Sequence, residues 1–367
     1  MLVPSVALPP DTMRTYDPWA RVVSCVDPWL GAVMSACVVL TALSGCSRDS
    51  ESHQTAPPGA AKSANASSPA DVTKSPVKSM GVATVLLEAA GSPYAATLAA
   101  DTDGIYLLMQ NAAYWLVPGR APQRWKLPLG ISPTLMDDLI VFWSEGSLWQ
   151  AHKRGGDPTV LAEVSHQPQR IVAHGGRLAW LDHAKETDGR YTIHTLKGAK
   201  ARLVCAPVGY VATLAMGEDQ VYFAERAKDR SWRLGAVGLS GGTPRYTEPK
   251  KGRTPAMLAV AQGVFYYDGP SSTVRRLSPD LQQEKVVARK VICSPIAVAE
   301  HIYCAQPAGI LELGRDGVVR RMLPSDPPGA ITAMAVTNNR LAWLMDVGQE
   351  HLAVKSLDVA SGADPSP

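Results

Sequence analysis

The five residues Arg177–Leu181, RLAWL, recur unchanged at Arg340–Leu344. Related phrases lie before and between the two copies, each made of a small apolar segment, a short polar turn and an apolar or aromatic segment. The first apolar residue of the second segment marks each copy, and these markers are Ile105, Ile140, Leu178, Val221, Val264, Ile302 and Leu341. Their spacing of 35 to 43 residues indicates an internal repeat of about 40 residues.

Each marker segment is followed by a polar loop, a third apolar segment, a Gly or Asp turn and, in most copies, a fourth segment. Four short antiparallel strands per unit of about 40 residues are typical of a β-propeller. The seventh copy stops after three strands at about Asp358, whereas an extra strand, Val82–Ala89, precedes the first copy. We therefore expect an all-β fold over residues 81–360: a seven-bladed β-propeller of four-stranded blades, closed by the N-terminal strand.

The phrase Leu239–Pro244, LSGGTP, resembles a turn sequence of bacterial TolB-like propellers. The resemblance covers about residues 81–360 at the level of repeat period and turn type, so it implies a fold far more than an activity. The blade signatures of Trp-Asp repeats, sialidases and quinoprotein dehydrogenases do not occur in the sequence.

Residues Trp29–Gly45, WLGAVMSACVVLTALSG, form an apolar run without charge. The run ends in a phrase that resembles the lipobox of bacterial lipoproteins, Leu43-Ser44-Gly45-Cys46. The resemblance implies that Cys46 receives a diacylglyceryl group and that the bond before it is cut. An uncleaved membrane anchor and a plain secretory signal remain alternatives, and Met13 is an alternative start.

Residues 47–80 are rich in Ser, Ala, Pro and Lys and contain no aromatic residue, so they cannot bury enough apolar surface to fold. We expect a signal peptide at 1–45, a lipidated cysteine and disordered linker at 46–80, and a disordered tail at 361–367. The linker would reach roughly 30 Å. Ser47 stands where an inner-membrane retention signal often has Asp, so the resemblance favours the outer membrane, facing the periplasm.

The formal net charge of +3 is spread along the chain without a basic block, so we expect no nucleic-acid partner. No H-E-x-x-H, G-x-S-x-G, phosphate-loop or dinucleotide motif occurs. Asp101-Thr102-Asp103-Gly104 begins like a calcium loop but lacks the later acidic positions, so we interpret it as a turn. His174 and His183 are too far apart along one hairpin to share an ion. We expect no metal, no cofactor and no catalysis.

Cys293 and Cys304 flank the first two strands of the sixth repeat, which brings them to the same rim of the sheet. In an oxidising periplasm they form either a disulfide or two buried thiols, and Cys205 is left unpaired. The tryptophans of the repeats are interpreted as filling between blades, with a ligand cage as the alternative. They are Trp115, Trp125, Trp143, Trp149, Trp180, Trp232 and Trp343.

Long charged loops between second and third strands share one face with the connectors between blades, and this face is a candidate binding rim. Its residues are Asp182, His183, Lys185, Glu186, Asp188, Arg190, Glu225, Arg226, Lys228, Asp229, Arg230, Lys250, Lys251 and Arg253. Merely solvated loops are the alternative interpretation.

We expect a lipid-anchored envelope protein whose propeller binds or scaffolds other envelope proteins or a cell-wall component. The alternative is a polysaccharide lyase or hydrolase with a site at the mouth of the central channel, because propeller active sites are assembled across blades and leave no local motif. Titratable residues at that mouth would favour the enzyme, an apolar plug would favour the scaffold, and a rim without any concavity would favour a purely structural surface protein.

Overall fold

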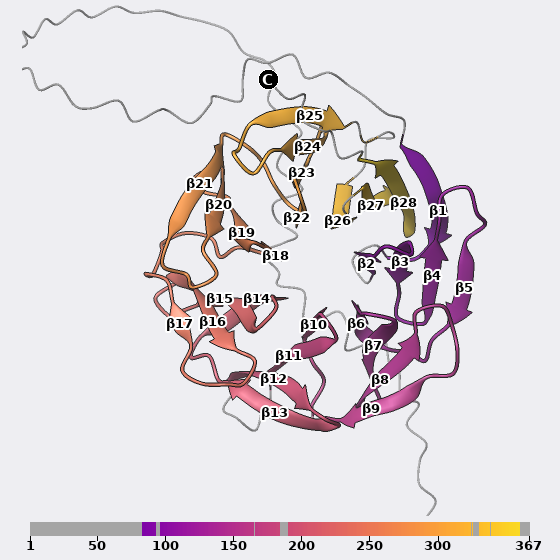
Figure 1. Cartoon of the computed structure of the whole chain (residues 1–367), viewed down its shortest axis with the longest axis horizontal. Coiled ribbons are helices and arrows are strands. Elements are labelled where there is room, and N and C mark those ends of the chain that lie inside the picture. The colour runs from indigo at the N-terminus through magenta and orange to yellow at the C-terminus, as the bar shows by residue number, and fades with distance from the viewer. Residues whose placement is uncertain are drawn as a thin grey trace, which may run out of the picture. The chain divides into compact units, whose positions relative to one another are not determined.

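The computed structural model describes residues 83–92, 96–164, 166–183, 190–323, 325, 330–337 and 339–359. Within these residues the chain forms 28 strands and no helix, arranged as seven sheets of four antiparallel strands. The sheets stand around a central axis as the blades of a β-propeller (Figure 1). The predicted fold class is therefore confirmed. The predicted signal peptide, linker and C-terminal tail lie outside the described residues.

In each of the first six blades the strands follow the chain from the innermost to the outermost. Blade 1 comprises β2 (Thr97–Ala100), β3 (Ile105–Leu108), β4 (Ala112–Leu116) and β5 (Gln123–Lys126). Blade 2 comprises β6 (Ile131–Met136), β7 (Leu139–Ser144), β8 (Ser147–His152) and β9 (Thr159–Glu163). Blade 3 comprises β10 (Arg170–His174), β11 (Arg177–His183), β12 (Tyr191–Lys197) and β13 (Lys200–Cys205).

The next three blades repeat this order. Blade 4 comprises β14 (Tyr210–Met216), β15 (Gln220–Arg226), β16 (Trp232–Gly238) and β17 (Arg245–Tyr246). Blade 5 comprises β18 (Leu258–Ala261), β19 (Gly263–Asp268), β20 (Thr273–Leu277) and β21 (Glu284–Arg289). Blade 6 comprises β22 (Ile296–Val298), β23 (Ile302–Gln306), β24 (Gly309–Leu313) and β25 (Val319–Leu323).

Blade 7 joins the two ends of the repeat region. Its inner three strands are β26 (Ala330–Val336), β27 (Arg340–Gly348) and β28 (His351–Asp358), and its outermost strand is β1 (Thr84–Ala90). β1 pairs antiparallel with β28, from Thr84 opposite Ser356 to Ala90 opposite His351. The N-terminal strand thus completes the last blade, as the sequence predicts, and gives β28 a partner along its outer edge.

The alternation of side chains within RLAWL explains why the phrase recurs. Successive residues of a strand point to opposite faces of the sheet. Leu178 and Trp180 pack in one core cluster with blade 2, whereas Ala179 and Leu181 pack in another with blade 4. The corresponding residues of Arg340–Leu344 pack against blades 6 and 1. Each copy therefore fills the interfaces on both sides of its blade.

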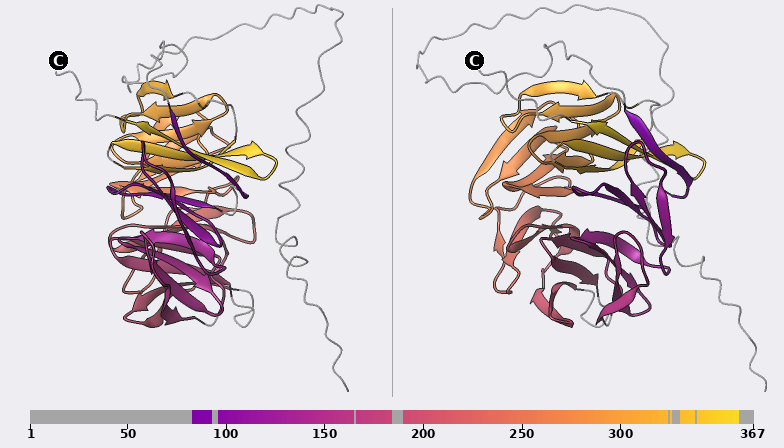
Figure 2. Two further views of the ribbon diagram at one scale, coloured as in Figure 1. Left: turned by 90° about the vertical axis from the view of Figure 1, so that its right-hand side faces the viewer. Right: turned by 45° about the vertical axis from the view of Figure 1, so that its right-hand side comes forward.

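The innermost strands surround the central channel (Figure 1), and the strands run between the two faces of the ring (Figure 2). In an antiparallel blade the first strand begins at the face where the second strand ends and the third begins. We call this face the upper face, and the opposite one, which carries the turns between first and second strands, the lower face. Within the described residues, no helix is long and apolar enough to span a membrane.

Candidate functional site

The candidate binding rim falls on the upper face of blades 3 and 4 and on the connector to blade 5. Lys185, Glu186 and Asp188 lie outside the described residues. Among the others, Asp182 and Glu225 are buried and Lys250 is half-buried. The exposed ones are His183, Arg190, Arg226, Lys228, Asp229, Arg230, Lys251 and Arg253. The described part of the rim is therefore mostly basic where it is exposed, with Asp229 as the acidic residue.

Asp182 and Glu225 do not belong to the exposed rim, because each stands one residue before the end of its strand and points into the sheet. Glu225 accepts hydrogen bonds from the backbone N–H of Gly209 and from Nε of Arg233, the latter at 3.0 Å. Nδ1 of His166 lies 3.5 Å from the carboxylate of Asp182. Glu225 thus stabilises blade 4, whereas Oδ1 of Asp182 is buried without a hydrogen-bond partner among the described residues.

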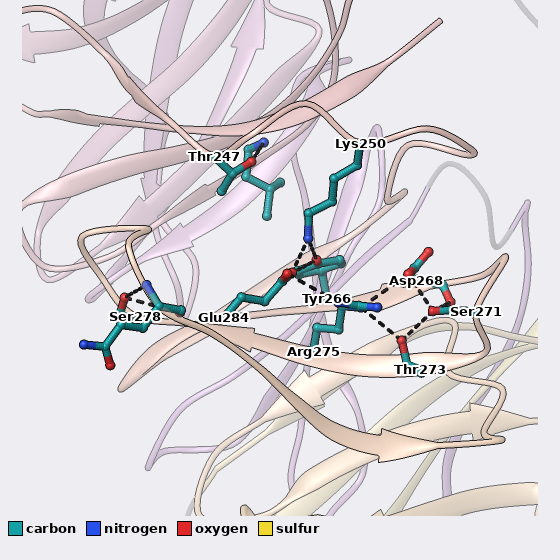
Figure 3. Close-up of polar contacts among 11 residues, drawn as sticks. Thr247, Lys250, Tyr266, Asp268, Ser271, Thr273, Arg275, Ser278 and Glu284 are labelled. Carbon is teal, nitrogen blue, oxygen red and sulfur yellow. Dashed lines mark hydrogen bonds and ion pairs between the residues drawn. The ribbon is translucent and has the colours of Figure 1, made fainter. Parts of the chain in front are cut away.

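Lys250 lies in a polar network between blades 4 and 5 (Figure 3). Its ammonium donates to the phenol oxygen of Tyr266 at 2.8 Å and pairs with Glu284. Nη1 of Arg275 reaches the second oxygen of Glu284 at 3.3 Å, and its Nε lies 3.3 Å from Asp268. Each charged group in this network has a partner of opposite sign. The network therefore holds the connector against blade 5.

The titration of this network fits a structural role. Burial acts to raise the pKa of Glu284, but hydrogen bonds from Lys250 and Tyr266 outweigh it and hold that pKa below its usual range. Burial, followed by the hydrogen bond to Glu284, raises the pKa of the Tyr266 phenol. At neutral pH the carboxylate of Glu284 is ionised and the phenol of Tyr266 keeps its proton. Proton transfer between the two groups is therefore unfavourable.

An aromatic and aliphatic patch lies between blades 3 and 4 on the upper face. His183 and Tyr191 have ring centroids 4.6 Å apart, and Tyr191 meets Tyr210 edge-on at 5.3 Å. Tyr210 is 55% exposed and Val208 is 84% exposed. We call these four residues the blade 3–4 patch. Tyr191 is itself buried and supports the exposed His183, Val208 and Tyr210. Exposed aromatic and aliphatic surface that is held in place in this way is typical of an interaction site.

A pocket of about 220 Å³ adjoins the blade 3–4 patch. Its lining residues are Val208, Gly209, Glu225, Ala227, Lys228, Ser231, Trp232, Arg233 and Pro249. The indole N–H of Trp232 has no hydrogen-bond partner among the described residues. That N–H is buried, and the pocket combines apolar walls with the charged residues Glu225, Lys228 and Arg233.

The channel holds a cavity of about 640 Å³ near its upper mouth, between the first residues of the innermost strands. Small polar and apolar side chains form most of its wall, and Arg170 is the one charged side chain among the described residues that line it. No carboxylate or imidazole from the described part of the chain lines it. The cavity is open rather than plugged, but these residues present no acid–base pair.

At the turn Asp101–Gly104, the ammonium of a lysine lies where a calcium loop would bind its ion. Oδ1 of Asp101 accepts the backbone N–H groups of Asp103 and Gly104 at 2.7 and 3.1 Å, which closes the turn. The ammonium of Lys153, from blade 2, lies 2.7 Å from Asp101 and 2.9 Å from Asp103. In the described residues no group of three His, Cys, Asp or Glu side chains is placed to hold a metal.

The cysteines of the propeller occupy two environments. Cys293 and Cys304 form a disulfide that ties the connector before β22 to β23. Cys205 is a buried free thiol, and burial, with a smaller effect of the Glu225 charge, raises its pKa to about 12. A thiol with that pKa is not a nucleophile at neutral pH. Cys46, with Leu43, Ser44 and Gly45, lies outside the described residues.

The tryptophans lie in the contacts between blades. Trp180, Trp232 and Trp343 are almost fully buried, and Trp115, Trp125, Trp143 and Trp149 pack partly buried against core clusters. Arg170, Val208 and Tyr210 are not among the site residues predicted from the sequence. A signal for Arg170 exists, because the residue eight positions before each repeat marker is small in the other six copies. Val208 and Tyr210 carry no comparable signal, since their exposure depends on the connector path.

No protein-family model and no curated protein sequence matches this chain. Solved structures share its fold. A selenomethionine-substituted virginiamycin B lyase from Staphylococcus aureus aligns at 13% identity over 74% of this chain and 98% of its own, with a TM-score of 0.54. The WD40 domain of Neurospora crassa Pan2 aligns at 10% identity over 75% of this chain and 95% of its own, also at 0.54. These similarities show the fold alone.

Proposed function

We propose that this chain is a lipid-anchored envelope protein of bacteria, of the TolB-like kind, whose propeller binds another envelope protein through the blade 3–4 patch and its adjoining pocket. The observation that carries the proposal is the exposure of Tyr210 and Val208 beside a pocket that contains Trp232. Interface hot spots are enriched in Tyr, Trp and Arg and lie in pockets that a partner side chain fills.

Charge around the pocket defines the kind of partner. Arg226, Lys228 and Arg230 are exposed beside it and form no ion pair with the described residues, whereas the nearby Glu225 is neutralised by Arg233. A surface of this kind favours a segment that carries carboxylates next to an apolar or aromatic side chain. The apolar side chain would fill the pocket, and the carboxylates would face the three basic side chains.

The anchor and linker suit this role. An acylated Cys46 would hold the chain at a membrane, because stable attachment needs more than one acyl chain. The composition of residues 47–80 supports a flexible linker that lets the propeller reach partners roughly 30 Å from the surface. The outer membrane, facing the periplasm, is the proposed location.

The alternative of a polysaccharide lyase or hydrolase gains no support from a specific observation. Such chemistry uses positioned carboxylates or an acid–base pair, and the described residues that line the channel cavity include none. A cell-wall component as the ligand of the patch is a distinguishable outcome of the experiment below.

The experiment compares the lipidated protein with a double variant, Val208→Asp with Tyr210→Ala, by cross-linking in its own membranes and mass spectrometry. Val318→Asp is the matched control, because Val318 is 44% exposed on the lower face. We expect one protein to be enriched by wild type and control and reduced about tenfold or more by the double variant. The purified partner should then bind wild type and Val318→Asp with similar affinity and the double variant more weakly.

Equal retention of that partner by the double variant, with all three proteins melting at the same temperature, would contradict the proposed surface. Capture of wall glycan by wild type, lost in the double variant, would replace the protein partner with a cell-wall ligand.

A further inference from the structure

One position of the repeat lines the channel in several blades and differs in one of them. The residues eight positions before the seven markers are Thr97, Ser132, Arg170, Thr213, Ala256, Ser294 and Ala333. Six are small, and the third is an arginine. Thr97, Arg170, Thr213 and Ala333 each pair with the third residue after their own marker. The four therefore occupy equivalent register positions, and one blade places a cation among hydroxyls and methyl groups.

Arg170 has no carboxylate partner among the described residues. Its Nη1 donates to Oγ1 of Thr213 at 2.6 Å. By contrast, Arg177 pairs with Asp219 at 2.9 Å and Arg340 with Asp358 at 2.9 Å. A guanidinium has five N–H donors, so most of the donors of Arg170 are free to bind a ligand.

The guanidinium of Arg170 is accessible from the channel. The residue is exposed, although neighbouring atoms partly desolvate it and lower its pKa. An accessible cation without a carboxylate partner attracts anions, and hydrogen bonds from a guanidinium to a carboxylate are among the stronger ones. The described lining residues offer no acidic group to pair with it.

The walls around Arg170 determine what else the anion would carry. Met257 and Leu258 line the same cavity and are half-buried, so part of their apolar surface is accessible from it. Gln169 adds an amide beside the guanidinium. The volume of about 640 Å³ lies within the usual range for small-molecule sites. The rest of the wall combines hydroxyl and amide groups with apolar side chains, so the cavity complements a small organic molecule with one anionic group and an apolar portion.

We propose that the upper channel cavity binds a small organic carboxylate, with its carboxylate on the guanidinium of Arg170 and its apolar portion against Met257 and Leu258. This site is separate from the blade 3–4 patch, and it requires neither lipidation nor a protein partner.

Calorimetric titration of the full-length protein with three probes tests the proposal. 3-Phenylpropionate carries both features, 3-phenylpropanol lacks the carboxylate, and inorganic phosphate lacks the apolar portion. We expect 3-phenylpropionate to bind with a Kd below about 10 mM and the other two to bind about tenfold or more weakly.

Arg170→Gln removes the charge, and Arg177→Gln is its matched control, since Arg177 begins the next strand on the lower face. We expect Arg170→Gln to weaken 3-phenylpropionate about tenfold or more, Arg170→Lys to restore part of the affinity, and Arg177→Gln to leave it unchanged. All variants should melt at the wild-type temperature. Equal binding by Arg170→Gln, equal binding of the alcohol or phosphate, or no binding of 3-phenylpropionate would each overturn the proposal.

Discussion

Lys153 shows how one side chain can take the place of an ion. Its side chain is 7% exposed, and its ammonium lies 2.8 Å from Asp138 of its own blade in addition to the two carboxylates of the Asp101–Gly104 turn. Asp101 and Asp103 belong to blade 1, so the lysine links two neighbouring blades at the lower face. The acidic residues of a turn that resembles a calcium loop thus form ion pairs with a lysine of the neighbouring blade.

Replacing Lys153 with Met should leave these carboxylates facing one another without a cation. We expect the free energy of unfolding at pH 7 to fall by about 1–2 kcal/mol, less than for a fully buried pair because solvent reaches Asp138. Urea denaturation measures the change, and Lys200→Met, at an exposed lysine, is the control. An unchanged midpoint would mean that the link between the blades contributes little.

The pH dependence should differ in sign between the two proteins. In wild type, hydrogen bonds from Lys153 lower the pKa of Asp103 and of Asp138 below 3.8. The stability they contribute is therefore present above the unfolded pKa and is lost as the pH falls through the folded pKa values. In Lys153→Met the carboxylates repel one another, so acidification toward pH 4 should narrow the difference in stability from wild type.

At the scale of strands, the sequence predicts the positions that recur in every blade. It does not predict environments that occur in one blade alone. The markers from Ile105 to Leu341 are all buried in second strands, because each blade must fill the same interface with its neighbours. Glu225 was expected on an exposed rim, yet it is buried against Arg233 and the backbone of Gly209. Its environment depends on a strand pairing and a connector path, and neither leaves a periodic trace.

The closing strand β1 gives a prediction at this scale. Deleting Thr84–Ala90 would expose the backbone N–H and C=O groups of β28 along one edge, and exposed edges promote pairing between molecules. We expect the melting temperature to fall by roughly 10 °C and the protein to self-associate in size-exclusion chromatography. Deleting an equal number of residues from the segment 47–80 is the control. A monomeric variant with the wild-type melting temperature would contradict closure by β1.

For the whole propeller, both proposed binding sites lie on the upper face. The blade 3–4 patch lies at the upper ends of β11, β12 and β14, and the channel cavity lies between the upper parts of the innermost strands. The lower face carries the tight turns and ion pairs such as that of Lys153. It also has a cavity of about 490 Å³ among these turns, lined in part by Gly176, Arg177 and Gly198.

Lipidation of Cys46 is the prediction that concerns the entire chain. We expect Cys46→Ser to lose the acyl groups and to keep residues 1–45, because the lipobox resemblance implies that lipidation and cleavage both depend on Cys46. The uncleaved apolar run could itself hold the chain in a membrane, so the intact mass decides and fractionation alone does not. Cys37→Ser is the matched control, since Cys37 lies in the same apolar run outside the lipobox. If the intact masses show that Cys37→Ser carries no more acyl groups than Cys46→Ser, the lipid anchor is ruled out. A secretory signal or a membrane-spanning segment then remains.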